Sequence, residues 1–391
     1  MQPLAGMTVV SLEQAIAAPF ATRQLADLGA RVIKIERPGV GDFARGYDTR
    51  VNGMSSHFVW TNRSKESLTL DFKDEEGRSI LSSLLEKADV FVQNLAPGAA
   101  SRLGLSYDQL HAQHPSLIVC DISGYGTGGP YEQFKAYDLM VQSEAGLVSV
   151  TGTENEMSKV GISVSDIAAG MYAYSSILAA LLERGRTGAG SHLDVSMLES
   201  TVEWMGFPLY YAFEEAAAPP RAGAAHATIF PYGPFSTGDG TTVMMAVQNE
   251  REWQNFCTTF MSDPALATRS EFSTNSARNE HREELGTMIA HRFNELTTEA
   301  AEELLAQVPL AHARVNDMAG VWAHPQLKAR QRWHEVETGA GTIPALSPPA
   351  FTDTKVRMDP VPDLGEHTDR ILTELGLGTD DIARLREHNV V

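Results

Sequence analysis

Basic side chains stand where several predicted strands end, and such residues can bind the phosphates of a ligand. The chain as a whole is very acidic, with a formal net charge of −19. Ligands of open α/β sheets collect beyond the carboxyl ends of the strands, whereas scattered Lys and Arg are usually solvated surface. A bound phosphorylated cofactor therefore explains this group better than chance does. The residues are Lys34, Arg37, Arg45, Lys73, Arg102 and Lys135.

Asp166 is a second residue placed to do chemistry, because it stands where a β-like segment enters a long helix. It follows Gly161–Ser165 and precedes the apolar run Ile167–Leu182. The ordinary interpretation of such an aspartate is an N-cap, in which the carboxylate accepts the free N–H groups of the first turn. The rest of the chain decides between this cap and a chemical role.

A glycine-rich segment, Ser123–Gly129, follows a predicted strand and resembles a dinucleotide fingerprint. Pro130 follows at once, so no helix opens on the last glycine to receive a pyrophosphate. The sequence therefore argues against a nicotinamide site, and we expect a loop in which bare backbone approaches another ligand.

Histidine and cysteine do not form a metal pattern. His111 and His114 are three residues apart but lack a carboxylate or cysteine partner at metal-ligand spacing. Cys120 and Cys257 are too few for a metal site or a disulfide framework. We therefore expect no metal.

Strand-like and helix-like segments alternate from Met7 to about Arg186, which predicts a mainly parallel sheet covered by helices. The expected strands are Met7–Leu12, Ala30–Ile35, Glu66–Phe72, Asp89–Gln93, Ser116–Ile122 and His192–Ser196. The expected helices are Phe20–Leu28, Asp74–Ala88, Tyr107–Gln113, Ile167–Leu182 and Met197–Phe213.

The long helix has two apolar faces and is predicted to be buried. Small residues fill one face, and glycines after Glu183 end the helix. Large apolar residues recur on the other face at Ile167, Met171, Tyr174, Leu178 and Leu181.

Two domains are expected from a chain of 391 residues. The large α/β domain covers residues 1–215, a linker rich in alanine and proline covers 216–227, and a small α+β domain covers 228–325. Within the small domain, Phe235–Val247 is predicted to be a hairpin with an Asp239-Gly240 turn. Residues 326–391 return to complete the large domain, with extended proline-rich chain from about Val321 and a final helix at Gly365–Leu375.

Composition indicates an ordinary soluble globular protein, with 43% hydrophobic and 21% charged residues. The negative net charge argues against binding to nucleic acid or to an anionic membrane. The amino terminus lacks the pattern of a signal peptide, and no window is expected to approach membrane-spanning length. We therefore expect a cytoplasmic protein.

Several ordered segments together resemble the class III coenzyme A transferases, the CaiB/BaiF family that also contains the α-methylacyl-CoA racemases. The resemblance spans nearly the whole chain and is far more specific than any one motif. Its segments are Leu4–Leu12, Ala26–Gly39 with Gly41-Asp42, Val92–Gly98 with Arg102–Leu105, Ile122–Gly126 with Gly129–Tyr131, Gly161–Asp166, Gly190–Glu199, Pro231–Phe235 with Gly238–Gly240, and Leu364–Thr368.

The resemblance implies a large Rossmann-like domain with a small domain, assembled as an interlocked homodimer, and a coenzyme A thioester as substrate. It implies that Asp166 is the nucleophile. Ile16 stands where some family members carry glutamine beside the active site. The positions that match the family's CoA contacts are Ala15, Ile16, Ala17, Arg37, Leu70, Lys73, Asn94, Leu95, Arg102 and Lys135, and Tyr137 is added as a residue that packs against or hydrogen-bonds the thioester.

The implied chemistry suits a carboxylate, which is ionised at neutral pH when its pKa is near the reference value of about 3.9. Asp166 would attack the thioester carbonyl, and the released thiolate would then form an aspartyl-CoA thioester. Oxyanion donors are expected in the loop Gly124–Gly129 or at the helix start, Ile167 and Ala168. The racemases have histidine where this chain has Tyr137, a poor base at neutral pH, so transfer is favoured over racemisation.

Substrate preference is inferred from similarity to members that use succinyl-CoA and short dicarboxylic acids such as itaconate, mesaconate or malate. Arg45, Arg221 and His226 are candidates to hold the distal carboxylate of such an acid. Two alternatives remain: an α-methylacyl-CoA racemase, and a non-catalytic acyl-CoA-binding protein in which Asp166 is a plain helix cap.

Overall fold

The computed structural model describes residues 2–349 and 356–391, which form two compact units. Unit 1 contains the chain up to Leu147, the segment Val160–Gly206 and the chain from Gln326 onward. Unit 2 contains Val148–Lys159 and Phe207–Pro325. These bounds differ from the predicted ones, since Val148–Lys159 and residues 207–215 were expected in the large domain but belong to unit 2.

Arg221 explains why Val148–Lys159 groups with unit 2. Its guanidinium donates to the backbone carbonyls of Ser149, Thr153 and Glu154 at 2.8–3.2 Å. The Gly223 N–H also donates to the Gly152 carbonyl. Long-range hydrogen bonds of this kind leave no signal in local sequence composition.

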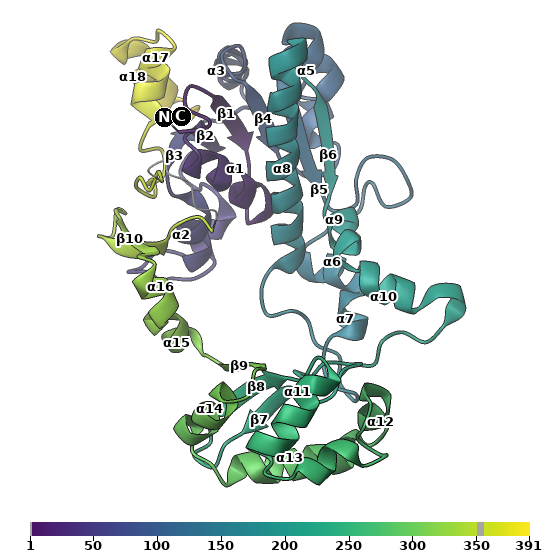
Figure 1. The fold of residues 1–391 in the computed structure, drawn as a ribbon. Coiled ribbons are helices and arrows are strands. Elements are labelled where there is room, and N and C mark those ends of the chain that lie inside the picture. The colour runs from purple at the N-terminus through teal and green to yellow at the C-terminus, as the bar shows by residue number, and fades with distance from the viewer. Residues whose placement is uncertain (1, 350–355) are drawn as a thin grey trace. The chain divides into compact units, whose positions relative to one another are not determined.

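Unit 1 is built on a six-stranded parallel sheet (Figure 1). The order is β3-β2-β1-β4-β5-β6, so the chain winds outward from β1 to β3 and then returns to continue on the other side of β1. The carboxyl ends of β1 and β4 thus mark the switch point, beyond which such sheets bind ligands. The strands are β1 (Thr8–Leu12), β2 (Arg31–Glu36), β3 (Lys65–Thr69), β4 (Val90–Gln93), β5 (Ile118–Ser123) and β6 (His192–Ser196).

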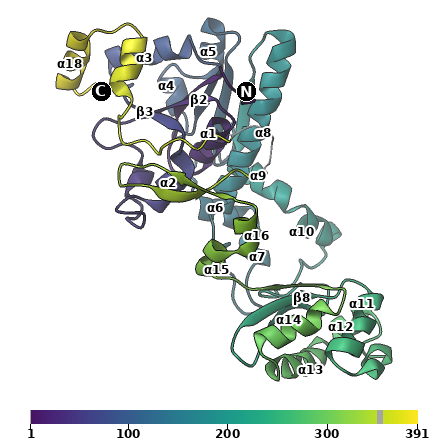
Figure 2. The same cartoon turned by 60° about the vertical axis from the view of Figure 1, so that its left-hand side comes forward.

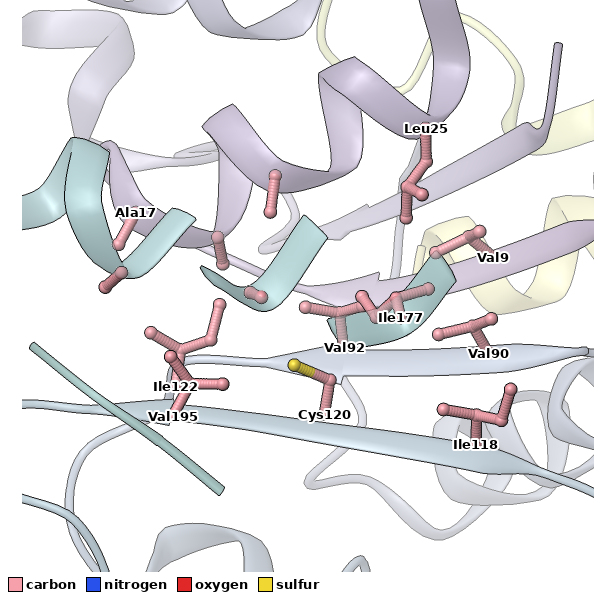
Figure 3. Close-up of a cluster of buried hydrophobic side chains, with 14 of the residues drawn as sticks. Val9, Ala17, Leu25, Val90, Val92, Ile118, Cys120, Ile122, Ile177 and Val195 are labelled. Atoms are coloured by element: carbon pink, nitrogen blue, oxygen red, sulfur yellow. The ribbon is translucent and has the colours of Figure 1, made fainter. Parts of the chain in front are cut away.

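Two helices, α1 (Ala17–Asp27) and α8 (Val164–Thr187), cover one face of this sheet and bury an apolar core against it. Figure 3 shows Ala17 and Leu25 from α1 and Ile177 from α8 above Val92 and Cys120 of the sheet. All five side chains are almost fully buried.

The two apolar faces of α8 are buried to different depths. Its small residues are the buried ones, and the large apolar residues are only partly buried or exposed, with Met171 37% exposed. Close approach to α1 explains this choice, because a Cβ atom on Gly170 would lie 2.7 Å from the Ala17 carbonyl oxygen. The buried residues of α8 are Ser165, Ala168, Ala169, Gly170, Ala173, Ile177 and Ala180.

Helix α8 has the length and apolar composition that a membrane-crossing helix requires. The expectation that no window approaches membrane-spanning length was therefore wrong. A long core helix meets the same criterion, and α8 packs its small residues in the core of unit 1.

The other face of the sheet is covered by α3 (Glu75–Leu85) and α5 (Tyr107–Gln113) together with the end of the chain, α17 (Thr368–Glu374) and α18 (Thr379–Glu387). Figures 1 and 2 show α18 near α3 and β3. Backbone hydrogen bonds join Asp71 to Val390 and Ser67 to His367. The return segment thus completes unit 1.

Unit 2 has an antiparallel sheet of three strands in the order β7 (Tyr232–Ser236), β8 (Thr242–Ala246) and β9 (Ala311–Arg314). The first two strands confirm the predicted hairpin. Buried aromatic rings, including Trp253, Phe256, Phe260 and Phe293, fill the core beneath the sheet. Strand β9 was not predicted.

Three further segments differ from the sequence interpretation. The chain from about Val321 was expected to be extended, but the end of one helix, a second helix and a hairpin lie there. Helix Met197–Phe213 is divided in two, and the loop before α8 contains two more helices. The remaining helices are α2 (Ser56–Asn62), α4 (Ala99–Arg102), α6 (Asp138–Glu144), α7 (Leu147–Val150), α9 (Met197–Trp204), α10 (Gly206–Tyr211), α11 (Glu250–Asn255), α12 (Asn275–Glu280), α13 (Arg282–Asn294), α14 (Thr298–Ala306), α15 (Met318–Ala323) and α16 (Pro325–Ala329), and the second hairpin is β10 (Trp333–Val336) with β11 (Ile343–Leu346).

Gly170→Ala tests the close packing of α8 on α1. We expect a lower thermal unfolding midpoint, since overpacking of this kind costs about 1–3 kcal/mol. Gly185→Ala on the same helix is the matched control, because nothing lies within 4 Å of the added Cβ atom. Alanine favours helix by about 1 kcal/mol over glycine, so the control should be as stable as the parent or more so. Equal midpoints for the two variants would contradict the packing described here.

Candidate active site

The predicted site residues gather at the carboxyl edge of the unit 1 sheet and at the start of α8. Arg37 follows β2, Leu70 and Lys73 follow β3, and Asn94 with Leu95 follows β4. The side chain of Leu70 is fully buried in the core, so only its backbone can face a ligand. All of the predicted positions belong to unit 1, namely Ala15, Ile16, Ala17, Arg37, Leu70, Lys73, Asn94, Leu95, Arg102, Lys135, Tyr137 and Asp166.

The loop between β1 and α1 is held in an unusual backbone conformation. Ala15 has φ = 62°, in the left-handed region that residues other than glycine rarely adopt. Asn94 accepts from the Gln14 N–H and donates to the Gln14 carbonyl, each at 2.9 Å. Asp42 Oδ1 accepts from the Ala15 N–H at 3.1 Å. The ends of three strands therefore clamp the loop at the switch point.

Asp42 belongs to a buried ion cluster beneath this loop. Its Oδ2 accepts from Lys34 Nζ at 2.6 Å, and Lys34 also lies 3.5 Å from Glu13. Glu13 pairs with Lys65 at 2.6 Å. Burial alone would raise the pKa of Glu13, but Lys65 and Lys34 outweigh it and lower that pKa. The charges thus compensate one another inside the core.

The second part of the cluster holds the segment after β2. Glu36 accepts two hydrogen bonds from Arg45, at 2.9 and 2.8 Å. Against the effect of burial, Arg45 and Lys34 lower the pKa of Glu36 to about 2. Burial lowers the pKa of Lys65 to about 7 despite its contact with Glu13. Arg45 and Lys34, which were expected to face a phosphate, are therefore committed to this cluster.

The first turn of α8 is capped by Asp138, the first residue of α6. Asp138 Oδ1 accepts from the N–H groups of Ser165 at 2.8 Å and Asp166 at 3.3 Å. Gln142, one turn further along α6, donates to Asp138 Oδ2 at 2.6 Å and accepts from the Val160 N–H at 2.9 Å. The N–H groups available to an N-cap carboxylate are thus taken by another aspartate.

The side chain of Asp166 makes no hydrogen bond or ion pair with any part of the chain that the structure describes. Burial, together with the negative charge of Asp138, raises the pKa of Asp166 to about 7. The expectation of a fully ionised carboxylate at neutral pH is thereby corrected. Asp166 is a partly buried carboxyl group without a structural partner, which is not the state of a helix cap.

Two tyrosines lie near Asp166. Tyr137 is the residue before α6, and its side chain is 65% exposed. Tyr47 follows the short helix η1 (Phe43–Gly46). Burial, with the charges of Asp42 and Asp166 and the nearby Tyr137, raises the pKa of Tyr47 to about 12. The Tyr47 phenol is thus a neutral group at physiological pH.

Three cations around the carboxyl edge have free charges. Arg37, Lys73 and Lys135 are exposed, and their side chains form no hydrogen bond or ion pair within residues 2–349 and 356–391. Arg102 donates only to the Pro97 carbonyl, at 3.4 Å. These four cations are arranged to bind an anionic ligand such as a phosphate.

Several of the N–H groups that were expected as oxyanion donors already have acceptors. In the glycine loop, Gly126 N–H donates to Ser123, Thr127 N–H to Asp194 and Gly128 N–H to Glu132. At the start of α8, the Ile167 N–H donates to the Ser163 carbonyl. By contrast, α1 begins at Ala17 without a side-chain cap.

The candidates for a distal carboxylate already have structural partners. Arg45 is held by Glu36, and Arg221 in unit 2 donates to three backbone carbonyls. His226, also in unit 2, accepts the Thr228 and Ile229 N–H groups through Nδ1. Each therefore has a structural role.

Three functional features were missed from sequence. Asp138 and Gln142 have the i, i+4 spacing of one helix face, but nothing local indicates that they reach the start of α8. Asp42 was recognised only as part of a motif. No pattern in the sequence indicated that Tyr47 lies near Asp166. As to metals, the described residues contain no group of three or more His, Cys, Asp or Glu side chains that could hold an ion.

A family model described as CoA-transferase family III matches residues 4–368. The chain is 36% identical to human succinyl-CoA:glutarate CoA-transferase over 392 residues, covering 98% of this chain and 88% of the relative. It is 32% identical to succinyl-CoA:mesaconate CoA-transferase of Haloarcula hispanica, covering 97% and 98% of the two chains. A CaiB/BaiF family protein from Brucella suis has a similar structure, with a TM-score of 0.85, 33% identity and coverage of 96% and 99%.

Asp166→Asn tests the raised pKa through stability. The folded protein holds a proton on Asp166 up to about pH 7, whereas the unfolded chain releases it near pH 3.9. This carboxyl group therefore destabilises the folded protein increasingly as the pH rises through that window. Asparagine removes the penalty, so the variant should exceed the parent in stability at pH 8 by on the order of 2–4 kcal/mol.

Thermal melts at pH 4 and pH 8 measure the effect, with the exposed Asp380→Asn as control. At pH 4 the Asp166→Asn variant and the parent should melt together. A variant less stable than the parent at pH 8 would contradict the assignment and restore the cap interpretation.

Proposed function

This chain belongs to CoA-transferase family III, and on that basis we propose that it moves coenzyme A from succinyl-CoA to a short dicarboxylic acid through covalent intermediates on Asp166. The observation that carries the proposal is the Asp166 carboxyl group itself. It has no structural partner among the described residues, stands at the start of α8, and is partly buried next to Asp138.

The reaction has two balanced halves. Asp166 carboxylate attacks the thioester carbonyl of succinyl-CoA, the C–S bond breaks, and a mixed anhydride and CoA thiolate form. The thiolate attacks the aspartyl carbonyl of the anhydride and releases succinate, leaving aspartyl-CoA. The acceptor carboxylate attacks that thioester to form a second anhydride, and the returning thiolate attacks the acceptor carbonyl to release its CoA ester and regenerate Asp166.

Asp138 supports this chemistry through charge. A carboxylate at Asp166 is destabilised by burial and by the Asp138 charge, as its raised pKa shows. A more basic carboxylate is a stronger nucleophile, and the anhydride and thioester at this position are neutral, so each acylation relieves the repulsion. Asp138 cannot move away, because it is bound to the first turn of α8 and to Gln142.

Residues at the sheet edge fit the CoA portion of the substrate. The exposed cations Arg37, Lys73 and Lys135 would bind the phosphates, with Arg102 beside them. The clamped loop at Ala15 would hold the thioester end against Asp166. The N–H groups of Ala17 and Ala18 have no acceptor among the described residues and would stabilise the developing oxyanion.

The choice of substrates rests on the relatives. Relatives at 32–36% identity include CoA-transferases named for succinyl-CoA with glutarate or mesaconate, which are five-carbon dicarboxylates, and one named for acetyl-CoA with oxalate. We infer a five-carbon dicarboxylic acceptor for this chain. The racemase alternative has no support at Tyr137, which stands where the racemases place their second base.

Intact-mass spectrometry after incubation with succinyl-CoA tests the proposal. We expect a covalent adduct that hydroxylamine removes, mapped to the peptide containing Asp166. Asp166→Asn should abolish the adduct and lower transfer by at least about a thousandfold, because no other group carries both half-reactions. Asp380→Asn is the control and should react like the parent.

Discharge of the adduct by a panel of acids identifies the acceptor, and glutarate and mesaconate should be the most effective. An adduct on another residue would contradict the role of Asp166. Proton exchange at the α-carbon of an acyl-CoA without any adduct would replace transfer by racemisation.

A further inference from the structure

We propose that His57 is the group that recognises the second carboxylate of the dicarboxylate substrate. This inference rests on the proposed function and names the residue that would make the site selective for dicarboxylates. Helix α2 (Ser56–Asn62) carries His57 in its first turn.

A dicarboxylate requires such a group because only one of its carboxylates reacts. The other stays ionised while the acyl chain lies in a site that is partly shielded from water. A charge moved out of water needs a hydrogen-bond donor, and a cationic one gives the strongest pairing.

Three cations close to this part of unit 1, Lys34, Lys65 and Arg45, have fixed partners. Lys34 and Lys65 are fully buried in the ion cluster. Arg45 is bound to Glu36 on one side and lies 3.7 Å from the centre of the Phe58 ring on the other. Removing any of these from its partner would leave a buried charge uncompensated, so none can serve a substrate.

His57 is accessible, and one side of its ring is fixed. Its Nδ1 lies 3.4 Å from Asp48 Oδ2, and its side chain is 43% exposed. Asp48 is itself held by the N–H groups of Arg50 and Ser56 and by the Ser56 hydroxyl at 2.7–3.0 Å. Within the described residues, Nε2 has no partner, so an imidazole that carries both protons can donate from Nε2 to a ligand.

Tyr47 connects His57 to the reacting group. The two rings meet edge to face, with centroids 5.3 Å apart and planes at 89°. Tyr47 is close enough to Asp166 to feel its charge. Both residues flank a loop anchored by Asp42, the residue that also holds Ala15. A substrate bound covalently to Asp166 would therefore extend past Tyr47 toward His57.

Asp48 makes the imidazole suited to an anion. When both ring nitrogens are protonated, Nδ1 donates to Asp48 and Nε2 is left to donate to the carboxylate of the substrate. A neutral terminal methyl gains nothing from the same contact. The residue therefore discriminates between substrates that differ only in that terminal group.

Binding of two acyl-CoA esters tests this role independently of catalysis. Succinyl-CoA and butyryl-CoA have four-carbon acyl chains that end in a carboxylate and a methyl group. Their affinities are measured by calorimetry with Asp166→Asn protein, in which no adduct can form. His57→Gln should weaken succinyl-CoA at least tenfold and leave butyryl-CoA within about twofold, which also shows that the variant is folded.

Two further variants complete the test. His57→Lys should restore part of the preference for succinyl-CoA, and the exposed His388→Gln should change neither affinity. Equal affinity changes for the two esters on His57→Gln, or no change in either, would overturn the role of His57. Lack of binding by either ester to the parent would overturn both this inference and the proposed function.

Recognition by His57 and covalent transfer through Asp166 can fail independently in these experiments. If the wild-type protein forms no adduct but His57→Gln still loses succinyl-CoA selectively, recognition by His57 stands and covalent transfer fails. If the adduct forms on Asp166 and His57→Gln has no selective effect, transfer stands and another residue recognises the carboxylate.

Discussion

The contact between the Asp138 carboxylate and the first turn of α8 determines the state of the candidate nucleophile. A helix start attracts a carboxylate, and Asp166 is the nearest one in sequence. Because Asp138 occupies that position from a different helix, Asp166 is left without a structural partner among the described residues. Its carboxyl group must then stay beside a like charge. The contact between Asp138 and the first turn of α8 thus determines both the position and the reactivity of Asp166.

On the other side of the site, buried charges hold the backbone of the loop between β1 and α1 in place, as Asp138 holds the start of α8. Lys34 and Asp42 pair inside the sheet edge, and Asp42 also accepts from the strained Ala15. A strained backbone persists only when its surroundings determine it. Here the N–H and carbonyl groups of Gln14 are held by Asn94 as well. The cost of burying several charges is offset by a loop of fixed shape at the switch point of the sheet.

Much of the fold could be predicted because it follows from local patterns. Alternating strands and helices indicated the parallel sheet, and the Asp239-Gly240 turn indicated the hairpin of unit 2. The sequence predicted that α8 is buried but not which of its two apolar faces packs in the core. Large apolar residues are the usual guide to a core, but the close approach of α1 required small ones, and that approach depends on tertiary structure.

The candidate site, too, could be predicted only in part. The cations at the strand ends and the position of Asp166 could be predicted, since they depend on where strands and helices begin and end. The partners of Arg45, Arg221 and Asp138 could not, because each reaches a residue distant in sequence or in another element. Those partners decided which charged groups stay free for a ligand.

The most direct test of the account is the pKa of Asp166 itself. A ¹³C NMR titration of protein labelled at the aspartate side-chain carboxyl carbon, with the Asp166 signal assigned by its absence in Asp166→Asn, measures it in the parent and in Asp138→Asn. The account predicts a midpoint near 7 in the parent and a lower midpoint when Asp138 loses its charge. A parent midpoint near 4, unchanged by Asp138→Asn, would show that Asp166 is an ordinary solvated carboxylate and would contradict the account.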